Sequence, residues 1–152
     1  MKASVDRQKV LLILNWCVKK FGKSRYQKKL PRLFVYKTRG TSRYEDRIAG
    51  LRGSYSNGRI KIYLGSIYSY KELCETLIHE YCHYMQSEFE FSVFYNRLKR
   101  DGHSVDTIYD IHPHEKKANR FEKRYGIQCF NELKAKLYKK LVHETRFERV
   151  PF

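Results

Sequence analysis

The chain has 152 residues, a formal net charge of +16 and a hydrophobic content of 41%, including 13 Tyr and 9 Phe. This length and apolar content predict a single domain over residues 1–152 with its own core, and they argue against intrinsic disorder. No apolar run approaches the roughly 20 residues that cross a membrane, so we expect no membrane partner. The four cysteines have no paired spacing, which favours a reduced, cytoplasmic or otherwise intracellular protein.

The positive charge is concentrated in the N-terminal quarter. Residues 1–40 contain twelve Lys and Arg and one acidic residue, a net charge of +11, whereas residues 69–95 contain one Lys and five Glu, a net charge of −4. Basic and aromatic side chains are interleaved over residues 19–39, as in proteins that bind nucleic acid or another polyanion. The alternative is a solvated surface that keeps the protein soluble, and no base-reading motif decides between the two.

The first elements in chain order are a helix and several strands. An apolar stripe at helical spacing predicts a helix over residues 6–21, which Gly22 can close. Residues 30–36 are rich in β-formers and predict a strand, and Ser-Asn-Gly at 56–58 predicts a hairpin turn. Alternating apolar residues predict a strand over residues 59–64. We expect this strand to form a sheet edge beside a cleft, where an extended peptide could pair with it.

A second helix is predicted directly after these strands. Ser69 and Glu72 form a capping box, and apolar residues then recur at spacings of three and four. No Pro or Gly interrupts this stretch. The pattern therefore predicts a helix of roughly 18 residues that begins near Tyr70.

This helix carries an H-E-x-x-H motif formed by His79, Glu80 and His83. Two histidines four residues apart lie on one face of a helix, where both imidazoles can bind one metal ion. Glu80 is turned about a quarter of a circle from His79, so it can act on a water molecule without being a ligand. The motif predicts a metal site, with Zn²⁺ as the metal. The alternative is a pair of histidines that are solvated or hydrogen-bonded within the core.

A catalytic zinc site needs a third protein ligand. The candidates are Asp110, His112, His114 and Glu115, which lie together further along the chain. A His-His-Glu set is well attested for catalytic zinc, and Glu115 falls in the first turn of a predicted helix. A third histidine six residues after the motif is excluded because Phe89 occupies that position.

The remaining segments complete an α+β order of elements. Residues 88–112 are apolar enough to form a short helix or to fold over the active site. Pro113 can start a helix that Gly126 caps, and an apolar stripe predicts a last helix over residues 131–148. The predicted fold is a small α+β domain with an N-terminal helix, a short antiparallel or mixed sheet, the motif helix and C-terminal helices.

Seven residues carry a family resemblance: His79, Glu80, His83, Glu115, Ala118, Asn119 and Phe121. With the glycine-containing segment 50–64 before the motif helix, they resemble the ImmA/IrrE family of zinc metallopeptidases over about residues 48–125. The resemblance implies a zincin-like, gluzincin-like domain, with Glu115 as the third zinc ligand and Glu80 as the general base. The chain departs from the family at Glu122, where a small residue is usual. Small zincins of phages and other mobile elements, and SprT-like DNA-associated proteases, are related alternatives.

The expected activity is zinc-dependent hydrolysis of a peptide bond in a protein or peptide substrate. Glu80 would take a proton from the attacking water, and Tyr109 or His112 could stabilise the oxyanion. Asn119 or Glu122 could support the metal-binding histidines. A second hypothesis is a non-enzymatic, basic protein on a zincin scaffold, structural or associated with nucleic acid. A third is a small-molecule hydrolase that uses the same zinc chemistry.

Overall fold

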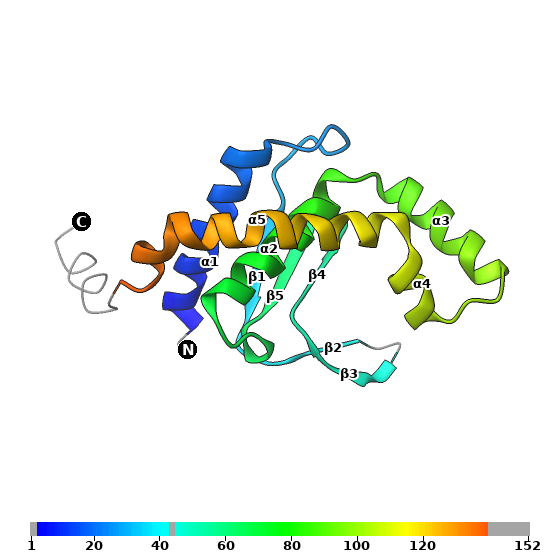
Figure 1. The fold of residues 1–152 in the computed structure, drawn as a ribbon, viewed down its shortest axis with the longest axis horizontal. Coiled ribbons are helices and arrows are strands. Elements are labelled where there is room, and N and C mark those ends of the chain that lie inside the picture. Colours follow the sequence, from blue (N-terminus) through cyan, green and yellow to red (C-terminus); the bar gives the residue numbers. More distant parts are fainter. Residues whose placement is uncertain (1–2, 43–44, 140–152) are drawn as a thin grey trace.

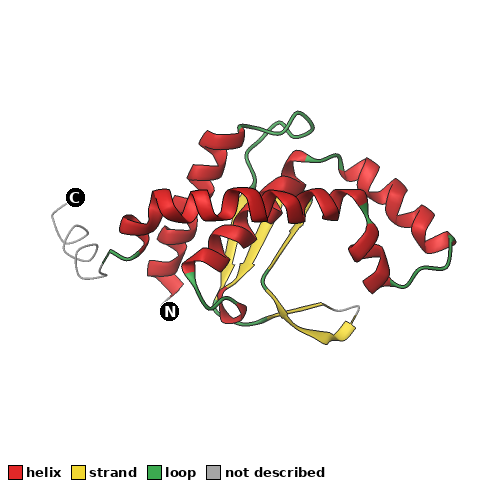
Figure 2. Ribbon diagram, viewed as in Figure 1, coloured by secondary structure: helices red, strands yellow, loops and turns green. Residues whose placement is uncertain are grey.

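The computed structural model describes residues 3–42 and 45–139. Its elements in chain order are α1 (Ala3–Phe21), β1 (Arg32–Tyr36), β2 (Gly40–Ser42), β3 (Glu45–Leu51), β4 (Gly53–Ser56), β5 (Arg59–Tyr63), the 3-10 turn η1 (Leu64–Ser66), α2 (Tyr70–Met85), α3 (Glu88–Arg100), α4 (Val105–Ile111) and α5 (Pro113–Leu137). This is the α+β architecture that the sequence predicts, with α2 and α5 running across the strands (Figure 1). Figure 2 shows the same view with helices and strands distinguished by colour.

The main sheet is mixed and has the strand order β1-β5-β4. Strand β5 pairs in parallel with β1 and antiparallel with β4. The expectation that residues 59–64 form a sheet edge is therefore wrong, because β5 is the central strand and β4 is an edge. The predicted hairpin turn is confirmed: Asn57 and Gly58 both have positive φ angles, of 48° and 75°, which match a two-residue turn between β4 and β5. Strands β2 and β3 form a separate antiparallel pair.

The core lies between α1, α2 and the main sheet. Its fully buried members include Val10 and Ile13 on α1, Ile60 and Ile62 on β5, and Leu77 on α2. The alternation predicted for β5 places both isoleucines in this core, while Arg59 is exposed. Because α2 is buried between the sheet and other helices, the H-E-x-x-H motif stands on a rigid element.

Helices α2 and α5 pack closely along their lengths. Gly126 is buried in the middle of α5, and a Cβ atom there would lie 2.6 Å from Cγ of Glu75. The prediction that Gly126 caps a helix is therefore wrong; the residue permits close packing instead, and α5 continues through it to Leu137. The predicted separate helix over residues 131–148 is the end of α5 as far as Leu137, and residues 140–148 lie outside the described part of the chain.

Residues 88–112 form two helices rather than one short helix. Ser87 caps α3 and Ser104 caps α4, each accepting a hydrogen bond from a backbone N–H three residues on. Helix α3 has no buried residue, and the pair extends beyond the end of the sheet (Figure 1). None of the helices in residues 3–42 and 45–139 combines the length and the apolar character needed to cross a membrane.

Candidate metal centre

Helix α2 begins where the capping box predicts. The hydroxyl of Ser69 accepts a hydrogen bond from the backbone N–H of Glu72 at 3.1 Å, which satisfies one of the unpaired N–H groups of the first turn. The apolar side of the helix is buried in the core, including Leu73 and Leu77. This leaves His79 and His83 on the side that faces the start of α5.

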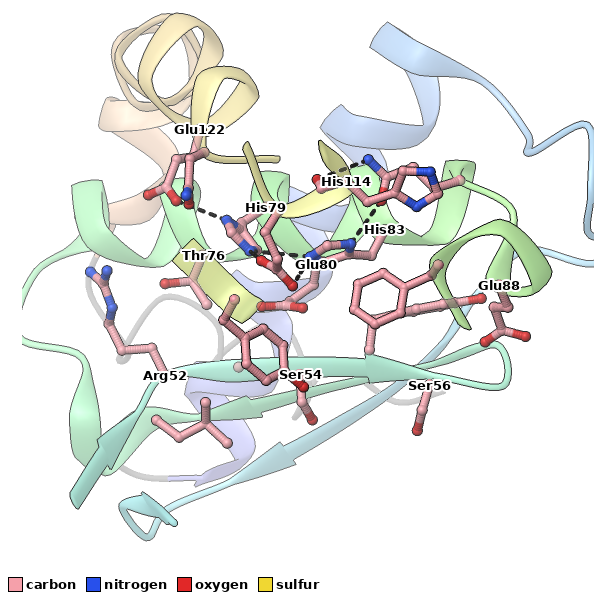
Figure 3. A pocket seen from close by; sticks show the side chains of 18 of the residues that line it. Arg52, Ser54, Ser56, Thr76, His79, Glu80, His83, Glu88, His114 and Glu122 are labelled. Carbon is pink, nitrogen blue, oxygen red and sulfur yellow. Dashed lines mark hydrogen bonds and ion pairs between the residues drawn. The ribbon is translucent and has the colours of Figure 1, made fainter. Parts of the chain in front are cut away.

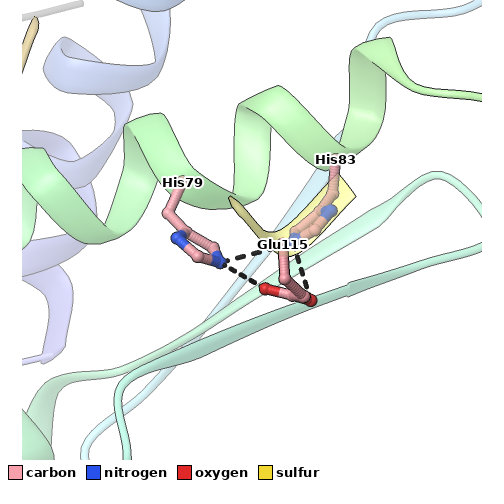
Figure 4. Close-up of side chains that lie close together, drawn as sticks. All are labelled: His79, His83 and Glu115. Atoms are coloured by element: carbon pink, nitrogen blue, oxygen red, sulfur yellow. Dashed lines mark hydrogen bonds and ion pairs between the residues drawn. The ribbon is translucent and has the colours of Figure 1, made fainter. Parts of the chain in front are cut away.

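Three potential ligands converge between α2 and α5 (Figure 4). The Nε2 atoms of His79 and His83 lie 3.3 Å apart, and each is 3.1 Å from a carboxylate oxygen of Glu115. Two ligands of a tetrahedral zinc ion, with bonds of about 2.0–2.1 Å, are separated by about 3.3 Å. The three residues therefore already have the spacing that one metal ion requires. Among the described residues they are the group that could hold a metal ion, and we refer to them as the metal-binding cluster.

The other nitrogen of each imidazole is held by its own partner. His79 Nδ1 lies 2.8 Å from a carboxylate oxygen of Glu122, and His83 Nδ1 lies 2.8 Å from Oε1 of Gln86. The Gln86 amide nitrogen donates to the carbonyl of His114 at 3.1 Å, which orients its oxygen toward His83. Both acceptors favour a proton on Nδ1, so in the neutral rings the Nε2 lone pairs point at the shared space.

Glu80 is buried, with 7% of its surface exposed, and it faces the same cleft (Figure 3). No hydrogen-bond donor reaches its carboxylate from residues 3–42 or 45–139. Burial raises the pKa of Glu80, while the neighbouring His79 and His83 lower it. A carboxylate that faces the cleft and lacks a protein donor is free to accept a proton from a molecule bound there.

The cleft has a volume of about 760 Å³ and runs between α2, the start of α5 and strand β4. Figure 3 shows β4 along one wall and the motif histidines along the other. Gly53 brings the two walls together, because a Cβ atom there would lie 2.8 Å from Cγ2 of Thr76 and 3.2 Å from Cγ of Glu80. This volume suits a ligand of drug-like or short-peptide size.

Searches against protein-family models, curated proteins and solved structures found no match for this chain. The interpretation of the cleft therefore depends on its own residues and their geometry.

The other residues proposed from the sequence take different positions. His112 is fully buried: its Nε2 donates to the carbonyl of Phe91 at 2.9 Å, and its Nδ1 accepts from the backbone N–H of His114 at 3.0 Å. Since both nitrogens are engaged, His112 caps α5 and is neither a third ligand nor an oxyanion donor. His114 and Tyr109 line the cleft without joining the metal-binding cluster.

The protonation of the histidines and the ionisation of the glutamates in the cluster depend strongly on one another. Burial lowers the pKa of His79, but hydrogen bonds to Glu115 and Glu122 outweigh burial and raise it to about 10. For Glu115, burial raises the pKa, but hydrogen bonds to His79 and His83 lower it to about 2. Without a metal, protons on the imidazoles balance the carboxylates, so a cation that binds here must displace those protons.

Two supporting features have no signal in the sequence. Gln86 follows the motif helix as its C-terminal cap, and its contact with His83 depends on the carbonyl of His114, 28 residues away. The position of β4 beside Glu80 depends on sheet pairing. Glu122 carried a signal, since it shares a helix face with Glu115, and its contact with His79 agrees with the supporting role expected for Asn119 or Glu122. Asn119 lines the cleft.

Proposed function

We propose that this protein is a zinc metallopeptidase in which His79, His83 and Glu115 hold the metal ion. The observation that carries the proposal is the convergence of two Nε2 atoms and one carboxylate at tetrahedral spacing beside a buried glutamate. Two nitrogens and one oxygen are a ligand set that catalytic zinc uses, with a position left for water. The resemblance of the motif spacing to the ImmA/IrrE family supports the same assignment. The four buried free thiols fit a reducing, intracellular compartment.

The protein groups would share the proton transfers. A zinc ion held at this position would polarise a carbonyl oxygen and would lower the pKa of a bound water molecule to about 7. Glu80 takes the proton from the attacking water and passes it to the leaving amine. Glu122 and Gln86 keep the imidazoles in the orientation and tautomer that leave Nε2 free.

Strand β4 supports a peptide as the substrate. Its residues line the cleft opposite the metal-binding cluster, and one edge is paired with β5. Within the described residues no strand pairs with its other edge. An extended peptide can add to such an edge by main-chain hydrogen bonds, which would hold a scissile bond beside Glu80.

The decisive experiment compares zinc content and cleavage of unfolded casein for the wild type and single variants. Glu80→Gln is expected to keep stoichiometric zinc and to lose cleavage, because the amide cannot accept the proton. Glu115→Ala is expected to lose both zinc and cleavage.

Asp101→Asn is the matched control, since it removes a carboxylate from an exposed position at the C-terminal end of α3. It should keep zinc and activity. Full cleavage by Glu80→Gln would refute the proposed general base, and unchanged zinc content in Glu115→Ala would refute the proposed ligand set.

A further inference from the structure

A second functional surface lies away from the cleft. It consists of exposed cationic side chains from the end of α1, from the loop between α1 and β1, and from α5, and we refer to it as the basic face. Its members are Lys20, Lys23, Arg25, Lys28, Lys29, Lys117, Arg120 and Arg124. None of them lines the cleft. In Figure 1 the loop lies along the upper edge of the molecule, on the other side of α5 from β4.

The backbone of the loop is held in place by two tyrosines of α2. The Tyr81 hydroxyl donates to the carbonyl of Gly22, and the Tyr84 hydroxyl donates to the carbonyl of Lys29 at 2.9 Å. The Tyr84 oxygen also accepts from the backbone N–H of Ser24 at 3.3 Å, and Ser24 is itself buried. These bonds fix the main chain of the loop, so its cationic side chains project from an ordered segment.

Aromatic packing joins the end of α1, directly before the loop, to α5. The ring of Phe21 lies 5.4 Å from that of Phe121 and 5.1 Å from that of Tyr125. The ammonium of Lys20 stands 5.7 Å over Tyr125, and that of Lys117 stands 5.9 Å over Phe121. Residues almost 100 positions apart therefore contribute to one continuous surface.

The cations of the basic face form no close ion pair within the described residues, although the charge of Lys20 acts on Glu132. Within residues 3–42 and 45–139, no carboxylate lies within ion-pair distance of any of them. A surface that serves only solubility mixes both signs of charge, whereas a one-sided surface repels itself and gains by binding a polyanion. Ion pairs occur instead around the cleft, where they involve His79, His83, Glu115 and Glu122.

The chemistry of the loop distinguishes among polyanions. Tyr26 is 50% exposed among the lysines, and the guanidinium of Arg25 lies 5.6 Å from its ring centre. An exposed aromatic ring beside phosphate-binding cations is the arrangement on which unpaired bases stack. Lipid headgroups and acidic peptides offer no flat group to such a ring.

We propose that the basic face binds single-stranded nucleic acid, with its cations on the phosphates and Tyr26 stacked on a base. The proposal does not depend on the hydrolase activity, because it concerns residues outside the cleft.

The test measures binding of the full chain to a fluorescent 20-nucleotide single-stranded DNA by anisotropy, with a chelator present. Wild-type affinity should fall as salt rises, since each neutralised phosphate contributes a slope of about −0.7 on a logarithmic scale. A combined Lys23→Gln, Arg25→Gln and Lys28→Gln variant should bind about tenfold or more weakly at 0.1 M salt. Tyr26→Ala should weaken binding about fivefold or more, by loss of stacking.

The matched control removes the same charge elsewhere. A combined Arg97→Gln, Lys99→Gln and Arg100→Gln variant neutralises three exposed cations at the end of α3 and should bind like the wild type within about twofold. Equal weakening by the two triple variants would show attraction by net charge alone and would overturn the proposal. Tighter binding to duplex DNA of the same sequence, to phosphatidylserine vesicles or to polyglutamate would overturn it too.

Discussion

The cleft and the basic face use charge in opposite ways. In the cleft, His79, His83 and Glu115 are partly buried and pair with one another at about 3 Å. On the basic face, the cations are exposed and have no carboxylate within ion-pair distance among the described residues. Buried pairs interact strongly and are screened little by salt, whereas exposed charges are weak individually and are screened within about 10 Å at 0.1 M salt. The cleft is therefore suited to chemistry at one point, and the basic face to attraction of an extended partner.

Removal of the Glu115 side chain should abolish tight zinc binding in the cleft and leave nucleic-acid binding by the basic face unchanged. We expect Glu115→Ala to weaken zinc binding by more than a hundredfold, a larger effect than the 10–100-fold that loss of a supporting residue causes. Affinity for single-stranded DNA should not change. Zinc titration with a competing chelator and anisotropy measure the two effects in one preparation. Loss of both functions would show that the variant is unfolded or that the two regions are coupled.

A change in salt concentration should weaken nucleic-acid binding by the basic face and leave zinc binding in the cleft nearly unchanged. Between 50 and 200 mM salt, about five phosphate contacts would cost nucleic-acid affinity about a hundredfold. Zinc affinity should change little, because its ligands are buried and close together. Measurement of both constants at four salt concentrations gives two slopes. A steep slope for zinc would mean that the metal is bound by exposed groups outside the cluster.

The sequence predicted the cleft better than its surroundings, for a physical reason. His79, Glu80 and His83 lie within one helix, where spacing alone determines which side chains share a face. Glu115 could be proposed as the third ligand because it also lies in a first helical turn. The sequence alone could not exclude His112 or His114 from that role, whereas the hydrogen bonds of His112 in the structure engage both of its nitrogens. Those bonds join residues far apart in the chain.

Sheet order and helix continuity were mispredicted for the same reason. Alternation identified β5 correctly as a strand, but which strand forms the edge depends on pairing with β1 and β4. Gly126 looks like a cap in the sequence because local rules do not include the approach of Glu75 from α2. Local patterns therefore predicted the elements, and contacts between distant residues decided their arrangement.

Variants of the residues that orient the two imidazoles should cause an intermediate loss of zinc affinity. Glu122→Gln and Gln86→Ala should each weaken zinc binding about 10–100-fold, because each removes the acceptor or charge that orients an imidazole. Glu88→Gln is a matched control, since Glu88 lines the same cleft and bonds to the backbone N–H of Asn57 instead. If the control weakened zinc binding equally, general cleft charge rather than imidazole orientation would explain the effect.

Bound zinc should change how the stability of the protein depends on pH. In the metal-free protein the pKa of His79 is about 10, above its ordinary 6.5, so its stabilisation is present below pH 6.5 and lost as pH rises through 10. The pKa of Glu115 is about 2, below 4.5, so its stabilisation is present above pH 4.5 and lost as pH falls through 2. Glu80 and Glu122 face the same imidazoles.

Between pH 6 and pH 9 we therefore expect the Tm of the metal-free protein to fall by about 5 °C. Zinc needs the neutral imidazoles, so the increase in Tm on adding zinc should grow over the same range. Calorimetry with chelator and with zinc measures both trends. Glu115→Gln should flatten the metal-free trend, because it removes the carboxylate that holds the protons. An unchanged slope in that variant would place the titrating group elsewhere.

The smallest effect is expected where α2 holds the basic loop. Tyr84→Phe removes one oxygen that accepts from Ser24 and donates to Lys29, while the buried ring keeps its contacts with Tyr55 and Tyr81. We expect a loss of about 1–2 kcal/mol in the free energy of unfolding and two- to threefold weaker binding of single-stranded DNA, because a less fixed loop loses more entropy on binding. Zinc affinity should stay the same, since His83 lies on a different side of the helix. Urea titration and anisotropy measure both changes. If nucleic-acid affinity did not change although stability fell, the fixed backbone of the loop would have no part in binding, and flexible cations alone would account for the attraction.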